Sequence, residues 1–250
     1  MRIWLPSTSS SRRSKSSACS WSAGARRLLV LVLLVAFSSP GWVHGAPAAP
    51  SLDEALQRLE ATYQRVSDLK ASFQQAALNR TLNQTLEARG TLYLKKPGKL
   101  RWEYATPAPQ EIVSDGKRLW IYTPELKQVN VSDAPAALAG PAGTFLQGLG
   151  QVRDHFQARF LNPAQPVDGD GLIVLDLTPK HPEPLLARLI LSIDPRTGLA
   201  RKAVVYDELG NTVTLRFVDV AVNTGLTDTL FVFTPPPGVA VVPTPTLGKP

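Results

Sequence analysis

Cysteine is nearly absent from this chain of 250 residues, and its single copy, Cys19, lies close to the N-terminus. No disulfide can therefore form within the chain, and the residues after Cys19 offer no thiolate nucleophile. A cysteine that carries a lipid anchor would follow an apolar export segment, whereas Cys19 precedes one. The fold must therefore rest on an apolar core alone. The roughly 205 residues that follow position 45 are enough to bury such a core.

Histidine is equally scarce, and no catalytic pattern is recognisable. His44, His155 and His181 lie in separate segments, without cysteine or carboxylate partners at metal-ligand spacing. The sequence has no G-x-S-x-G turn for a nucleophilic serine and no glycine-rich phosphate loop that opens a helix. Asp168 and Asp170 flank a glycine, which is typical of a plain turn. We therefore expect no enzymatic activity, no metal and no cofactor; a secreted enzyme is an alternative from a different class.

Acidic residues are missing from the first 45 positions, which hold six Lys and Arg. An apolar run of ten residues, Leu28–Phe37, follows these charges, and turn-forming or small residues lead from there to Gly45. This order is typical of a secretory signal peptide, because a bilayer span needs about 20 apolar residues; a retained signal anchor is the alternative. Without the leader the net charge falls from +7 to +1, with 21 basic and 20 acidic residues. We therefore expect no nucleic-acid partner, which would need a basic domain.

One amphipathic helix is predicted directly after a Pro/Ala linker at 46–50. Ser51 and Glu54 form the S-x-x-E capping box that starts a helix. Apolar residues then recur at spacings of three and four, as one buried helical stripe requires: Leu52, Leu56, Leu59, Tyr63 and Val66.

The period changes to two from Leu69 onward, which predicts strands. The Pro97-Gly98 and Asp115-Gly116 pairs are turn signals between alternating segments. Further strands are expected at 155–161, 172–177, 186–193, 200–206 and 212–222, and residues 243–250 are expected to form a loose tail. Short strands at this spacing indicate an antiparallel meander in a single domain that spans residues 46–250.

Residues 132–150 interrupt the predicted sheet. A helix is expected to begin at 132–135, and repeated glycines should break the rest of the segment into short pieces. Apolar side chains in this segment suit a mobile cover: Leu138, Phe145, Leu146 and Leu149.

Three segments are apolar at both strand parities, namely 119–122, 172–175 and 189–191. Such strands need cover on both faces. The predicted helix and the broken helical segment could supply cover for a half-barrel closed by a lid. Taken alone, however, apolar residues at strand spacing favour an ordinary core over a ligand cavity.

Five segments, in order along the chain, resemble the LolA family of periplasmic lipoprotein carriers. They are Val66–Gln75, Gly90–Trp102, Val113–Tyr122, Leu177–Lys180 and Phe231–Gly238. The resemblance runs from about residue 52 to residue 242. It implies a mainly β fold, an incomplete antiparallel β-barrel (half-barrel) covered by the N-terminal helix and the broken helical segment.

The resemblance also implies a role. Carriers of this family take lipoproteins from an ABC-type releasing complex in the inner membrane, cross the periplasm, and deliver them to the outer-membrane receptor LolB. They work as monomers without a cofactor. A lipid-sensing regulator or a glycolipid carrier on the same half-barrel is the alternative.

We infer candidate site residues from strand parity together with this resemblance. Leu92 and Leu94 share one face of their strand, as do Leu100, Trp102 and Tyr104 on the next strand, so we expect these five to line an acyl-chain cavity.

The lid and its gate are expected to comprise Lys96, Leu56, Leu59, Tyr63, Leu138, Phe145, Leu146 and Leu149. The family commonly has an arginine just before the hairpin proline, where this chain has Lys96, which keeps the charge but loses the planar fork of donors. By parity Lys96 points inward, and the expected acceptors are orphan helix-end carbonyls within 132–150. A lysine turned outward to water is the alternative.

We predict cleavage near Gly45–Ala46, which would release a chain without cysteine into the periplasm. Mass spectrometry of the exported protein measures the new N-terminus. A membrane-retained form, or an N-terminus upstream of Leu28, would contradict the signal-peptide interpretation.

Overall fold

The computed structural model describes residues 50–134, 149–181 and 186–243. All of them belong to one compact unit, Ala46–Pro250. The predicted leader, most of the predicted broken helical segment and the end of the predicted tail lie outside the described residues, so those expectations stay predictions.

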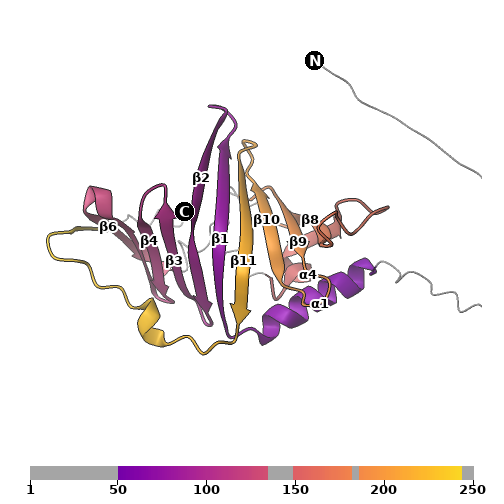
Figure 1. The fold of residues 1–250 in the computed structure, drawn as a ribbon, viewed down its shortest axis with the longest axis horizontal. Coiled ribbons are helices and arrows are strands. Elements are labelled where there is room, and N and C mark those ends of the chain that lie inside the picture. The colour runs from indigo at the N-terminus through magenta and orange to yellow at the C-terminus, as the bar shows by residue number, and fades with distance from the viewer. Residues whose placement is uncertain (1–49, 135–148, 182–185, 244–250) are drawn as a thin grey trace, which may run out of the picture. The chain divides into compact units, whose positions relative to one another are not determined.

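Twelve strands form one sheet in the order β12-β6-β5-β4-β3-β2-β1-β11-β10-β9-β8-β7, and every adjacent pair is antiparallel except β12 with β6. The edge strands β12 and β7 do not pair with each other, so the sheet stays open (Figure 1). This confirms the prediction of a mainly β, unclosed antiparallel architecture. The strands are β1 Asp68–Asn79, β2 Gln84–Lys95, β3 Lys99–Thr106, β4 Gln110–Asp115, β5 Arg118–Thr123, β6 Gln128–Asp133, β7 Phe156–Phe160, β8 Ile173–Pro179, β9 Arg188–Ile193, β10 Ala200–Tyr206, β11 Thr212–Val222 and β12 Ala240–Pro243.

Helix α1, Leu52–Arg65, begins where the capping box predicts. The Ser51 hydroxyl accepts a hydrogen bond from the Glu54 N–H, and the Glu54 carboxylate accepts one from the Ser51 N–H at 2.8 Å. These hydrogen bonds lower the pKa of Glu54. The predicted apolar stripe is buried except for the half-buried Leu52, so α1 packs on the sheet through one face. Its axis lies across the strand ends near β9 and β10 (Figure 1).

Several boundaries differ from the predictions. Strands β1 and β2 each run for 12 residues, and together they form a hairpin that projects beyond the neighbouring strands (Figure 1). His155 ends the short helix α4, Val152–His155, and the strand predicted from it starts at Phe156. Ser132 and Asp133 end β6, so the helix that the sequence predicts to begin within 132–135 begins at Ala134. Pro243, expected in the loose tail, ends β12.

The outer face of β3–β6 is covered by a segment that we call the C-terminal strap, residues 223–239. It contains the short 3-10 helix η2, Asp228–Phe231, and a second such turn, η1, Pro124–Leu126, precedes β6. Phe231 is 1% exposed, and the Phe233 ring lies 6.3 Å from that of Trp120 and 5.8 Å from that of Tyr122. The two-sided apolar pattern at 119–122 is therefore explained by this strap on the outer face, an arrangement that the sequence pattern did not predict.

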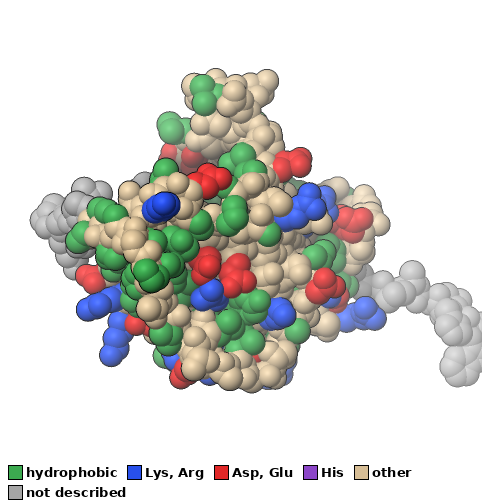
Figure 2. Space-filling model, turned by 60° about the vertical axis from the view of Figure 1, so that its left-hand side comes forward, with side chains coloured by type: hydrophobic (Ala, Val, Ile, Leu, Met, Phe, Trp, Pro, Cys, Tyr) green, Lys and Arg blue, Asp and Glu red, His purple; other side chains and the backbone are tan. Residues whose placement is uncertain are grey.

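Polar contacts fix the strap along its length. The Asp68 carboxylate accepts hydrogen bonds from the N–H groups of Thr224 and Gly225 at 2.7 and 3.0 Å, and Lys95 donates to the Leu226 carbonyl. Lys95 and Lys99 also flank Asp228, whose pKa their hydrogen bonds lower to about 2. Figure 2 turns the β6 side of the sheet forward and shows hydrophobic side chains there among acidic and basic ones.

Among the described glycines, Gly90 leaves the least room for a Cβ atom. It pairs with Phe73 on β1, and the β2–β3 register shifts between Arg89 and Gly90. A Cβ at Gly90 would lie 1.8 Å from the Glu103 carbonyl oxygen and 2.9 Å from the Phe73 ring. The Phe73 ring, in turn, stands edge-on to Trp102 and Tyr104 at 5.1 Å from each.

Gly90→Ala is expected to lower the free energy of unfolding by about 2–3 kcal/mol, because backbone must move to admit the methyl group. Gly169→Ala is the matched control, since a Cβ there meets nothing within 4 Å. Denaturant unfolding of both variants measures the difference. Equal stability of the two variants would show that the β2–β3 backbone yields freely at Gly90.

Candidate functional site

The inner face of the sheet is a continuous apolar surface. Cross-strand pairing sets Leu92 opposite Trp102 and Leu94 opposite Leu100, and it sets Gly90 opposite Tyr104. The five predicted cavity residues therefore share one face. Leu92, Leu100 and Trp102 are buried, and Leu94 and Tyr104 pack against them. That this face holds acyl chains stays a prediction.

Residues from neighbouring strands extend the same face and were not assigned to it from the sequence. Ala71 pairs with Leu92, and Phe73 pairs with Phe217 of β11. Phe73 is 1% exposed and Phe217 is 6% exposed. The alternation along β1 places Ala71 and Phe73 on one face, but only the pairing with β11 brings Phe217 beside them. The sequence therefore indicated that Ala71 and Phe73 share a face, but it did not indicate that Phe217 lies beside them.

Helix α1 covers part of this face. Leu56, Leu59 and Tyr63, three of the predicted lid residues, are buried against the sheet, and Leu149 joins the same core. The remaining predicted lid residues, Leu138, Phe145 and Leu146, lie outside the described residues.

Polar contacts hold α1 at both of its sides. Arg58 donates to the Pro195 carbonyl and Thr62 to the Thr197 carbonyl, so the helix is tied to the β9–β10 turn. On the other side, Glu60 accepts hydrogen bonds from the backbone and side chain of Arg153 in α4. The helix is therefore fixed by polar contacts near the edge of the apolar face.

Lys96 reaches the last turn of α1. Its ammonium donates a hydrogen bond to the Tyr63 carbonyl, and its backbone N–H donates to the Ser67 carbonyl at 2.8 Å. The acceptors expected in 132–150 fall almost entirely outside the described residues, so that part of the expectation stays a prediction. The acceptor that the structure shows is also a helix-end carbonyl, and it belongs to α1. Physically, the last carbonyls of α1 lack partners within the helix, and a cation there also meets the negative end of the helix dipole.

Two tyrosines contribute polar groups to this interior. The Tyr63 hydroxyl accepts a hydrogen bond from the Ala200 N–H at 3.2 Å, and burial raises its pKa to about 12. The Tyr104 hydroxyl donates to the Gln75 side chain at 3.2 Å, and burial raises its pKa as well. Partial burial also lowers the pKa of Lys96. Each shift disfavours the charged form, as expected for an interior of low polarity.

A small cavity separates α1 from the sheet. Its volume is about 10 Å³, and it is lined by Tyr63, Leu69, Ala71, Leu92, Ala200, Phe217 and Val220. Such a void is about large enough for one water molecule. Beside Tyr63, helix and sheet therefore leave little free space between them.

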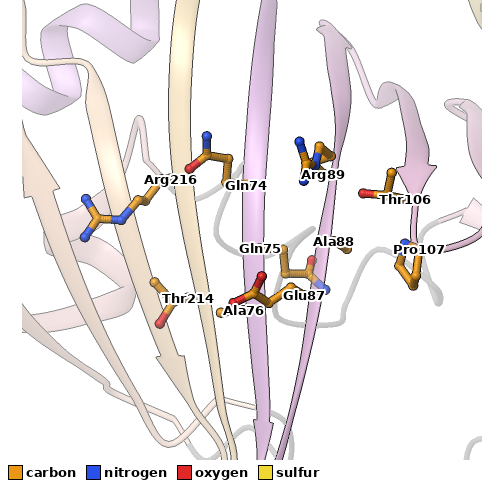
Figure 3. Close-up of a pocket in the computed structure, with 10 residues that line it drawn as sticks. All are labelled: Gln74, Gln75, Ala76, Glu87, Ala88, Arg89, Thr106, Pro107, Thr214 and Arg216. Atoms are coloured by element: carbon orange, nitrogen blue, oxygen red, sulfur yellow. The ribbon is translucent and has the colours of Figure 1, made fainter.

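A larger hollow of about 540 Å³ lies where β11, β1, β2 and the end of β3 adjoin (Figure 3). Gln74, Glu87, Arg89 and Arg216 line it, and by parity they belong to the face opposite Phe73. Charged and amide groups suit apolar chains poorly, since each would lose water on contact. This hollow is therefore not the acyl-binding candidate.

Among the described residues, no three His, Cys, Asp or Glu side chains come together as a metal site. In the same part of the chain, no helix is long and apolar enough to cross a membrane. The groups gathered on the inner face can exclude water and contact apolar chains.

An open antiparallel sheet with a helix-covered apolar interior defines a β half-barrel of the kind that can shelter apolar groups. A family model described as outer membrane lipoprotein carrier protein LolA matches residues 64–234. A relative from Dechloromonas aromatica named outer-membrane lipoprotein carrier protein is 32% identical over 188 residues, which cover 75% of this chain and 87% of the relative. A relative of the same name from Nitrosomonas europaea is 31% identical over 218 residues, which cover 87% of this chain and 98% of the relative.

The chain therefore belongs to the LolA family. A crystal structure of an uncharacterized conserved protein from Thermus thermophilus shares the fold, with a TM-score of 0.50 and 19% sequence identity. That likeness covers 78% of this chain and 100% of the other.

Proposed function

We propose that this protein shields the acyl chains of lipoproteins and carries them through the periplasm, from an ABC-type releasing complex in the inner membrane to the receptor LolB in the outer membrane. The observation that carries the proposal is the continuous apolar inner face of an open sheet. Family membership supports it, and so do the names of the relatives. Removal of residues 1–45 on export is part of the same proposal.

Transfer energies favour such a role. Burying one methylene group contributes about 0.8 kcal/mol, so a chain of 15 carbons gains about 12 kcal/mol in gross terms. Each leucine that α1 buries contributes about 1.5–3 kcal/mol. Acyl chains can therefore replace the helix contacts on the inner face, and the helix can reclaim that face after release.

We further propose that Lys96 is the latch of the covered state. A hydrogen bond from a charged donor contributes about 1.5–3 kcal/mol, which is enough to favour one position of α1 and small enough for cargo to overcome. Because Lys96 lies at the β2–β3 turn and Tyr63 in the last turn of α1, their bond joins the sheet to its cover.

Leu100→Glu is expected to weaken binding of a fluorescent diacylated peptide at least about tenfold, since it puts an unpaired charge on the apolar face. Leu82→Glu is the matched control, because Leu82 is 63% exposed in the β1–β2 turn. The half-buried Leu94→Glu tests the same face at lower risk to folding, which circular dichroism monitors.

Folded Leu100→Glu and Leu94→Glu variants that bind the diacylated peptide as the wild type does would show that this face does not hold the acyl chains. If the wild type binds a glycolipid and ignores the diacylated peptide, the related glycolipid-carrier function replaces the one proposed here.

Lys96→Leu is expected to admit an apolar fluorescent probe more readily in the empty protein, because the hydrogen bond to the Tyr63 carbonyl is lost. The same variant should transfer cargo to LolB poorly, since the covered state no longer competes with cargo. Lys96→Arg keeps a charged donor and is the control that should restore both properties. Unchanged probe binding and transfer in Lys96→Leu would show that Lys96 only caps the end of α1 and is no latch.

A further inference from the structure

The indole of Trp102 contains a buried donor without a partner. Trp102 is 3% exposed, and its Nε1 is the buried side-chain nitrogen or oxygen for which the described residues provide no hydrogen bond. Unpartnered buried donors are rare in folded proteins because they lose their water without compensation. In a protein with an apolar binding face, such a donor points to a ligand atom.

Other polar groups near Trp102 on the inner face have their partners. The Tyr104 hydroxyl donates to Gln75, and the Ser114 hydroxyl donates to the Gly98 carbonyl and accepts from the Gly116 N–H, each at 3.1 Å. Phe73 stands edge-on to the Trp102 ring, and an N–H contact with an aromatic ring is only a weak substitute for a hydrogen bond. The donor therefore stays available to a carbonyl.

The proposed cargo has one atom that fits. An acyl chain is apolar along its length and carries a single acceptor, the carbonyl oxygen at its head. That oxygen loses its water when the chain enters the inner face, and it needs a donor there. Trp102 stands among Leu92, Leu100 and Phe73, which suit the hydrocarbon that follows the carbonyl.

We propose that the Trp102 indole N–H donates a hydrogen bond to the carbonyl oxygen of a cargo acyl chain, which makes Trp102 a specificity-determining residue for acyl over alkyl groups. This inference rests on the proposed function and adds to it that the protein distinguishes acyl from alkyl cargo. Trp102 lies three residues into β3, about 10 Å from the β2–β3 turn that carries Lys96. The bound carbonyl is thus near the latch, and the hydrocarbon extends over Phe73 toward Phe217.

Two synthetic lipopeptides test the inference: one with two ester-linked hexadecanoyl chains, and one with the same peptide and two ether-linked hexadecyl chains. The ratio of the two dissociation constants is measured for wild type, for Trp102→Phe and for Trp120→Phe. The ester preference of the wild type should exceed that of Trp102→Phe by about threefold to tenfold, the effect of one neutral hydrogen bond. Trp120→Phe, on the outer face against Phe233, should keep the wild-type ratio.

Nitrogen-15 NMR of the indole N–H groups gives a readout that a purely structural role would not move. The Trp102 signal, assigned in the wild type by its through-space contacts with the Phe73 ring, should shift downfield with the ester peptide and not with the ether peptide. This measurement uses the wild type and keeps the inference testable even if Trp102→Phe fails to fold.

The outcomes separate the two proposals. Wild type that binds neither lipopeptide would refute the carrier function itself. Wild type that binds both, with an ester-to-ether ratio unchanged in Trp102→Phe or an indole signal that ignores the ester, would refute the role of Trp102 while the carrier function stands.

Discussion

The structure depends on one constraint: a sheet that never closes has an apolar inner face that needs cover in water. In a closed barrel the strands themselves enclose the inner face. Here helix α1 covers it through Leu56, Leu59 and Tyr63. The side-chain hydrogen bonds that place the helix lie near its edges, at the β9–β10 turn, at Arg153 and at Lys96. Apolar contact under the helix has little directional preference, so this layout lets one apolar partner be exchanged for another.

The two faces of the sheet are stabilised by different means. The inner face relies on apolar packing, while the strap on the outer face combines two phenylalanines with an ordered series of polar contacts from Asp68, Lys95, Lys99 and Arg101. Arg101 donates to the Leu230 carbonyl and pairs with Glu103 and Glu111. Directional contacts on one face can hold the curvature of the strands fixed while the opposite face changes its cover.

Local patterns in the sequence predicted local structure well. The Ser51–Glu54 capping box marks the start of α1, and the alternation of Leu100, Trp102 and Tyr104 places them on one face. These features depend on residues a few positions apart, where helical and strand periods act directly.

Long-range features were missed for a physical reason. The Tyr63 carbonyl as acceptor of Lys96, the strap over Trp120, and Phe217 beside Phe73 join residues far apart in the chain. Periodicity cannot specify which distant segment covers a face. The parallel pairing of β12 with β6 was likewise hidden, because a four-residue strand with Val241 and Val242 resembles an apolar tail.

That short parallel strand has a consequence for the protein at high concentration. An open sheet has two edges, and a bare edge with free N–H and C=O groups can pair with the same edge of another molecule. At one end, β12 occupies the edge of β6 with residues from the chain's own C-terminal part, and within the described residues its own edge is four residues long and ends at Pro243. At the other end, β7 is five residues long and carries Arg159, whose side chain is 74% exposed. Shortness, proline and charge are all ways in which proteins block edge pairing. An open half-barrel can thus keep its interior accessible without joining its neighbours into fibres.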